Sequence, residues 1–276
     1  MRLACVGGMA CGLCLNAVAQ PNVAAWGLLK RELGNNDPDR RKQAVLAVGT
    51  IGPAREVISL LKQLLRDKDV VVRQTTAAAI GEFKYQACKP ALRAALDDDP
   101  EVAVQAAKSL WAMGDRSSRT VLQALYTGQE QGGPGLIAGA MRDAKDKLKH
   151  PKKLILLAVN EASGALLGPF SIGIIATENM LKDNGAPGRA LAADLLSQAC
   201  DPGAVQLMTW TLDKDKNNLV RAATAKALGK CGNVTTVNRL MLLLADNSPA
   251  VRDMAAASVV RLTKNSAHRM RAGFGR

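Results

Sequence analysis

A pattern of small, apolar and charged positions recurs along this chain about once every thirty residues. When copies are aligned on an arginine, which we call the anchor, an apolar residue follows seven places later. The pairs are Arg41 with Val48, Arg73 with Ile80, Arg189 with Leu196, Arg221 with Leu228 and Arg252 with Val259, and Ala103 with Leu110 where the arginine is replaced. Successive anchors are 32, 30, 86, 32 and 31 residues apart, which predicts stacked repeats.

Each copy is expected to contain two helices. Around Arg221, residues 219–232 (LVRAATAKALGKCG) place alanines and leucines at helical spacing, which predicts a first helix with a narrow apolar face. A second amphipathic run follows a turn in several copies, as at 53–66, 85–96 and 234–245. A unit this short cannot bury its own apolar face, so neighbouring units must stack.

The motif D-P/acid-x-V-R…A-A…L-G…G, seen at 69–81, 100–114, 218–232 and 249–259, resembles the HEAT-repeat family. The resemblance is to its short bacterial form, known from phycobilisome-lyase-type repeats, and it covers about two thirds of the chain. The resemblance implies an all-α, right-handed solenoid whose second helices line a concave face. It also implies a non-catalytic role as a protein-interaction or assembly scaffold.

The anchors Arg41, Arg73, Arg189, Arg221 and Arg252 have two interpretations. Aspartates precede the anchor position in several copies of the repeat (Asp37, Asp39, Asp69 and Asp99), which favours an Arg–Asp ladder between adjacent repeats. The alternative is a row of cations that binds an anion.

Residues 1–19 (MRLACVGGMACGLCLNAVA) have a positive start, an apolar middle and a small-x-small end, which predicts a secretory signal peptide. The protein is then expected to be exported to the periplasm or the exterior of a bacterium. Peripheral association with the envelope is compatible with this location. A lipoprotein signal ending at Cys11 and an ordinary N-terminal helix are the alternatives.

The remaining chain divides into four parts. Residues 20–128 hold a capping helix (22–33) and three repeats, 129–185 an irregular basic, Gly-rich helical segment, 186–264 the C-terminal repeats, and 265–276 a basic tail. Within the irregular segment, 154–177 has one charge, Glu161, and the spacing Gly164/Gly168. A packed helical hairpin is the preferred interpretation, and a membrane element is the alternative.

Three of the six cysteines lie beyond the predicted signal peptide: Cys88, Cys200 and Cys231. Cys200 and Cys231 are one repeat apart, so a disulfide between them is open in an oxidising compartment. We favour buried apolar thiols.

No motif of catalysis or metal binding is present. The two histidines, His150 and His268, lie far apart in basic surroundings, and there is no His-Glu pairing of the kind that the HEAT-fold iron hydroxylases use as ligands. We therefore expect no enzyme activity, no cofactor and no metal, with a cryptic enzyme as the last alternative.

The net charge of +13 suggests a polyanion-binding module as the second function class. Anionic lipid or cell-wall polymer fits an exported protein, whereas nucleic acid is disfavoured because aromatics are only 3% of the chain. The main expectation remains a protein partner, and its identity and the oligomeric state stay open.

We expect the interaction surface to lie on the second helices. The candidates are Arg55, Lys62, Lys89, Arg93, Gln206, Trp210 and Arg239. Trp210 is the leading candidate because aromatic residues dominate interface energetics, and a core tryptophan between repeats is its alternative.

The signal peptide gives the first testable prediction. In a secreting bacterium the mature protein should begin at Gln20, which mass spectrometry of the intact protein would show. Recovery of a chain that retains Met1 in the cytosolic fraction would contradict it.

Overall fold

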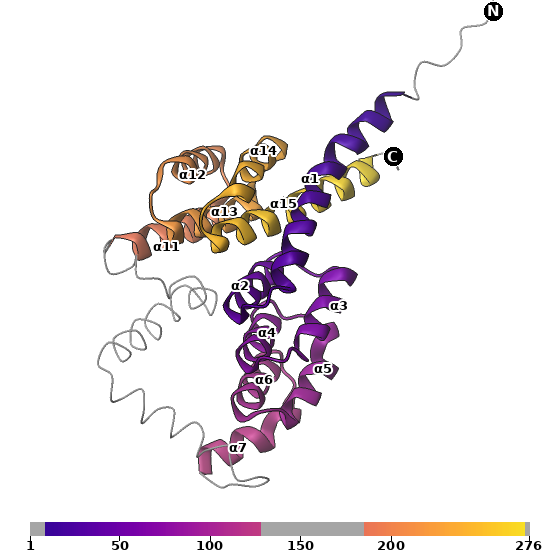
Figure 1. Cartoon of the computed structure of the whole chain (residues 1–276), viewed down its shortest axis with the longest axis vertical. Coiled ribbons are helices and arrows are strands. Elements are labelled where there is room, and N and C mark those ends of the chain that lie inside the picture. The colour runs from indigo at the N-terminus through magenta and orange to yellow at the C-terminus, as the bar shows by residue number, and fades with distance from the viewer. Residues whose placement is uncertain (1–8, 128–184, 274–276) are drawn as a thin grey trace, which may run out of the picture.

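The computed structural model describes residues 9–127 and 185–273, and within these ranges the chain forms helices joined by turns, without a strand (Figure 1). The all-α class is confirmed. The first helices of the repeats are α2 (Pro38–Gly49), α4 (Val70–Glu82), α6 (Pro100–Ala112), α11 (Ala186–Ala199), α13 (Asn218–Cys231) and α15 (Pro249–Gly273). The second helices are α1 (Met9–Leu33), α3 (Arg55–Leu64), α5 (Lys89–Ala94), α7 (Arg119–Thr127), α12 (Pro202–Lys214) and α14 (Val234–Leu242). Short 3₁₀ turns flank some of them: η1 (Gln86–Cys88), η2 (Ala95–Asp97), η3 (Arg116–Ser118) and η5 (Leu243–Ala245).

The helices begin where side chains can satisfy free backbone N–H groups. Asp69 caps α4 by accepting hydrogen bonds from the backbone of Val71 at 2.9 Å and Val72 at 3.2 Å. Asn233 caps α14 through a reciprocal capping box with Thr236. The polar residues between the repeated motifs therefore set the helix boundaries.

The six first helices form one row, but not in chain order. α11 packs on α13 and α13 on α15, while α2 packs on α4 and α4 on α6. α15 also packs on α2, so the C-terminal repeats precede the N-terminal ones in the stack. The solenoid is therefore continuous through a contact between the two ends of the chain.

α1 completes the repeat that α15 begins. α1 packs along α15 before the chain turns into α2, so α15 and α1 together form what we call the composite repeat. Ala25, Leu28 and Leu29 of α1 are buried, and the Asn22 amide donates a hydrogen bond to Thr263 Oγ1 at 2.7 Å. The helix expected to cap the first repeat thus takes the place of a second helix for the last one.

Polar contacts from α15 fasten it to the first repeat. Arg261 donates to the carbonyl of Thr50 and Lys264 to the carbonyl of Pro53, both at 2.9 Å. α15 continues to Gly273, so most of the expected tail (265–276) is helical. α15 contains no glycine, which is a poor helix former, before Gly273, and the helix ends at that residue.

The curvature differs from our expectation. In Figure 1 the row of first helices bends at α15, and the second helices α3, α5, α12 and α14 lie on the outer side of the bend. First helices rich in alanine approach closely, while larger side chains hold the second helices apart.

The predicted Arg–Asp ladder is present, and the partners are aspartates in the following loop. Arg41 pairs with Asp67 through two hydrogen bonds of 2.9 and 2.7 Å. Burial alone would raise the pKa of Asp67, but hydrogen bonds from Arg41 and from the Asp69 backbone bring this pKa below its usual value. The equivalent pairs are Arg73 with Asp98 and Asp99, Arg189 with Asp215, and Arg221 with Asp246.

Each rung of the ladder is linked to the next. Arg73 donates to the backbone carbonyl of Asp67, whose carboxylate holds Arg41. Arg252 makes the equivalent bond to the carbonyl of Asp246 at 2.7 Å. One loop aspartate therefore fixes two successive anchors, which sets the register of neighbouring repeats.

Two glycines allow first helices to come into close contact. A Cβ at Gly229 would lie 2.7 Å from the Cβ of Ser258, and Gly81 is similarly close to Ser109. Both serines donate to a backbone carbonyl of the neighbouring first helix, Ser258 to Ala225 and Ser109 to Ala77, each at 2.8 Å. The same contact is thus used in both halves of the solenoid.

Adding a methyl group at this contact should destabilise the fold. Gly229→Ala is expected to lower the free energy of unfolding by about 1–3 kcal/mol because the backbone of α15 must move away. Gly27→Ala is the matched control, since open space surrounds that position on α1 and alanine favours the helix by up to about 1 kcal/mol. Urea denaturation of both variants would reject this account if Gly229→Ala were as stable as Gly27→Ala.

Candidate functional site

A groove lies between the second helices α12 and α14 of the C-terminal repeats. Its volume is about 650 Å³, and its lining includes Gln206 and Trp210 from α12 and Arg239 from α14. Three of the seven residues expected on the interaction surface therefore meet at one place. Gln206 and Trp210 lie about one repeat before Arg239 in the sequence, and the stacking of the two repeats brings the three side chains together.

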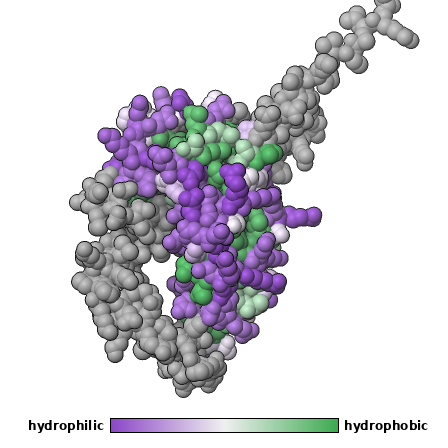
Figure 2. Space-filling view, in the orientation of Figure 1, coloured by the Kyte–Doolittle hydropathy of each residue, from purple (hydrophilic) through white to green (hydrophobic). Residues whose placement is uncertain are grey.

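Apolar side chains on the two helices that form the groove are open to solvent. Trp210 is 63% exposed, Leu207 on the same helix is 52% exposed, and Leu242 on α14 is 68% exposed. Figure 2 shows green apolar side chains among the purple over the C-terminal repeats. The alternative interpretation of Trp210 as a core residue is wrong. Leu207 and Leu242 were missed, although Leu207 lies one helical turn before Trp210.

Charged and polar groups cross the groove. Arg239 on α14 and Asp213 on α12 form an ion pair of 3.3 Å, with both side chains partly exposed. Asn233 and Thr236, which form the capping box of α14, line the groove at the start of that helix. The groove thus combines one aromatic surface with a small set of oriented polar groups, as binding sites commonly do.

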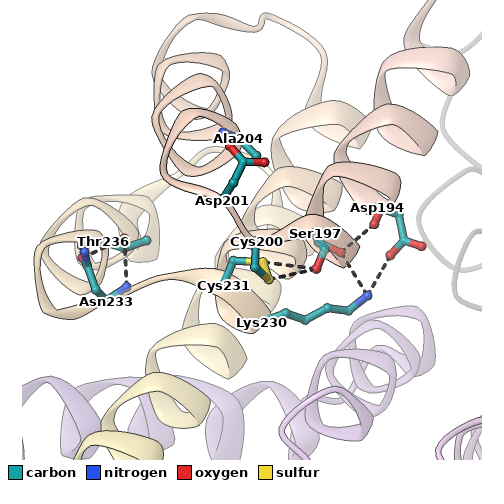
Figure 3. The surroundings of a disulfide bond; sticks show 9 residues. All are labelled: Asp194, Ser197, Cys200, Asp201, Ala204, Lys230, Cys231, Asn233 and Thr236. Carbon is teal, nitrogen blue, oxygen red and sulfur yellow. Dashed lines mark hydrogen bonds and ion pairs between the residues drawn. A yellow bond between two sulfur atoms is a disulfide. The ribbon is translucent and has the colours of Figure 1, made fainter.

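A disulfide between Cys200 and Cys231 forms part of the groove (Figure 3). The cysteines lie at the ends of α11 and α13, with Cα atoms 5.1 Å apart. The expectation of free thiols was wrong here, because stacking places the two helix ends within bonding distance. Cys88 is a buried free thiol, and burial raises its pKa.

The surroundings of the disulfide are held by a polar cluster on α11 and α13. Both sulfur atoms lie against the backbone oxygen of Ser197, and Lys230 donates to the Ser197 hydroxyl and to Asp194 (Figure 3). Burial would raise the pKa of Asp194, but Lys226 and Lys230 together bring it below its usual value. The carboxylate therefore stays ionised and keeps the two helices paired beside the groove.

The other candidates lie on the N-terminal half. Arg55 and Lys62 are on α3, and Lys89 and Arg93 are on α5. Arg93 pairs with Asp115 at 2.6 Å; hydrogen bonds from the backbone and side chain of Ser117, with a further contribution from Arg93, lower the pKa of Asp115 to about 2. Arg93 thus supports the loop between repeats.

Among the described residues, His, Cys, Asp and Glu side chains form no group of three that could hold a metal ion. No helix in residues 9–127 or 185–273 is long and apolar enough to cross a membrane. The segment 154–177, for which a membrane element was the alternative, lies outside the described residues.

Comparisons with known proteins agree with the repeat pattern. A family model described as HEAT repeats matches residues 58–132 and 176–261, which is more than half of the chain. A search of curated proteins finds no match. Among solved structures, human deoxyhypusine hydroxylase in complex with glycerol is 18% identical, covering 89% of this chain and 97% of that one with a TM-score of 0.32. An engineered protein is 19% identical, covering 88% and 97% with a TM-score of 0.25.

Removing the disulfide should destabilise the C-terminal repeats. It closes a loop with a sequence separation of 31, for which loss of the cross-link is expected to cost about 3–4 kcal/mol. Cys231→Ser should therefore unfold at lower urea concentration than Cys88→Ser, which removes a thiol and no cross-link. Treatment with a reductant should bring the wild type to the level of Cys231→Ser, and an unchanged wild-type midpoint would contradict the prediction.

Proposed function

This chain belongs to the HEAT-repeat family, and on that premise we propose that it is a non-catalytic scaffold that binds a protein segment in the groove between α12 and α14. The observation that carries the proposal is the exposure of Trp210 at the edge of this groove. An aromatic side chain left in water is costly unless a partner covers it, and tryptophan is enriched among residues that dominate binding. Leu207 and Leu242, on the same two helices, are also exposed.

The chemistry of the groove supports binding over catalysis. The side chains of Asp213 and Arg239, which carry its charge, are engaged with each other. A general acid–base pair would need groups free to exchange protons with a substrate. The groove therefore fits recognition of an apolar residue with polar contacts around it.

The partner that we propose carries acidic residues beside its apolar anchor. The outer face of the N-terminal half presents Arg55, Lys62, Arg66 and Lys89, which form no ion pair with other described residues. Together with the net charge of +13, these cations complement an acidic segment. The same cations also favour the second candidate partner, a polyanion such as anionic lipid or a cell-wall polymer. We prefer a protein partner because the groove also exposes apolar surface.

We further propose that the scaffold works outside the cytosol, at the bacterial envelope. The predicted signal peptide motivates this location, and the Cys200–Cys231 disulfide is consistent with an oxidising compartment. The repeat spacing of 30–32 residues supports the short bacterial form of the family, of the phycobilisome-lyase type.

Substitution of Trp210 tests the proposed site. After chemical cross-linking in the native envelope fraction, the wild type should retain a specific protein that Trp210→Ala loses. In a titration with that protein, affinity should fall about 30-fold or more, because loss of a central tryptophan typically costs about 2 kcal/mol.

Trp111→Ala is the matched control, since Trp111 is also exposed (43%) but lies on α6, in the other half. Equal loss of affinity in the two variants would contradict the proposal. A different result would instead support the polyanion function. In that case the wild type is retained on heparin or anionic vesicles, Trp210→Ala does not affect this retention, and Lys62→Glu abolishes it.

A further inference from the structure

A buried aspartate lies where the two ends of the chain meet. Asp253 on α15 is 1% exposed, and both of its carboxylate oxygens lack a hydrogen-bond partner in the described structure. The neighbouring helices α1 and α2 contribute Glu32 and Arg40 to its electrostatic surroundings. A carboxylate in such a place is costly to ionise, because nothing replaces the water that it loses.

The repeat itself does not require an acid at this position. The residue directly after the anchor is Ala190 in the repeat of Arg189 and Ala222 in that of Arg221, and both alanines are buried. Asp253 occupies the equivalent position after Arg252. The aspartate is therefore a departure within the C-terminal repeats, and it lies on the helix that joins the two halves.

The cations near Asp253 are engaged elsewhere. Arg40 makes two hydrogen bonds to Glu32, at 3.0 and 2.9 Å, and Arg252 donates to the backbone carbonyls of Asp246 and Asn247. On α13 and α14, the helices on the other side, the cations pair with other aspartates: Arg221 with Asp246, Lys226 and Lys230 with Asp194, and Arg239 with Asp213. Ionised Asp253 would therefore remain an uncompensated charge in the contact.

We propose that the composite repeat is a pH-controlled joint, which is closed while Asp253 is protonated and loosens when this carboxyl group ionises. Loosening would separate α15 from α1 and α2. These are the contacts that hold the C-terminal groove in a set position relative to the basic outer face of the N-terminal half. The joint would thus control the spacing between the two surfaces of the scaffold, which goes beyond the proposed binding itself.

The direction of the pH effect follows from the burial of Asp253. Burial first, then repulsion by Glu32, raise its pKa from 3.8 to about 7, against the opposing effect of Arg40 and Arg252. In the open joint, where water reaches the carboxyl group, the pKa returns to its ordinary value. The stabilisation by the protonated group is therefore complete below about pH 4, is lost as the pH rises towards 7, and changes no further above that.

Hydrogen exchange of the full chain measures this opening without any partner. Backbone protection in peptides from residues 22–33 and 249–262 would be followed from pH 5 to 8, after correction for the intrinsic rate at each pH. Protection in the wild type should fall by about tenfold per pH unit up to pH 7 and then level off. Peptides from residues 70–82 of α4 should keep their protection, because opening is confined to the joint.

Two variants remove the titrating group. Asp253→Ala restores the residue that the two preceding repeats use, and Asp253→Asn keeps the shape without the charge. Both should lose the fall in protection between pH 5 and 7 and should exceed the wild type at pH 8. The control is Asp97→Ala, which removes an exposed carboxylate and should behave as the wild type does.

Three results would overturn the proposal. The first is wild-type protection at the joint that does not fall between pH 5 and 7. The second is an equal fall in the Asp253→Ala variant. The third is an equal fall in the α4 peptides, which would mean global unfolding. Since no partner takes part, these results are independent of whether Trp210 binds one.

Discussion

The contact of α15 with α2 is the constraint on which the rest of the structure depends. It joins two sets of repeats into one row of first helices, although nothing covalent links them at that point. α1 then covers α15 as its second helix, with Leu28 and Leu29 buried between them. The first and last helices therefore pair with each other in the middle of the stack, and the bend in Figure 1 occurs at this place. Any change that weakens the composite repeat acts on the shape of the whole solenoid.

Away from this joint, the two halves use the same contacts. The Arg–Asp rungs and the Gly–Ser contacts recur in each, so neighbouring repeats hold one register. At the joint the loop residue six places before the anchor is Asn35, where the other loops have Asp67, Asp215 or Asp246. Asn35 still accepts a hydrogen bond from the backbone of Asp37, so the turn is preserved, but Arg252 forms no ion pair within the described ranges. The composite repeat thus lacks the salt bridge that Arg41, Arg73, Arg189 and Arg221 form, and it carries the unpaired Asp253 as well.

The consequences for function follow from the division into halves. The apolar groove around Trp210 lies on the C-terminal half, and the cations of α3 and α5 lie on the N-terminal half. A partner with an apolar anchor and an acidic segment would contact both only when the joint holds them at the right distance. The disulfide and the Lys230–Asp194 pair connect α11 to α13 beside the groove, whereas the proposed change in geometry takes place at the joint.

The sequence by itself determined the repeat, the two helices of each unit, the all-α class and the anchors, because helical spacing, caps and turns are local properties of the chain. It also placed Gln206, Trp210 and Arg239 on second helices, though not that these three would meet while Arg55, Lys62, Lys89 and Arg93 lie in the other half. Asp213 became part of the site only through stacking. The order of the repeats, the pairing of α1 with α15, the Cys200–Cys231 bond and the isolation of Asp253 were decided by the tertiary structure. Each depends on which faces pack together, in the case of Asn22 and Thr263 across 241 residues of chain, and no local pattern contains that information.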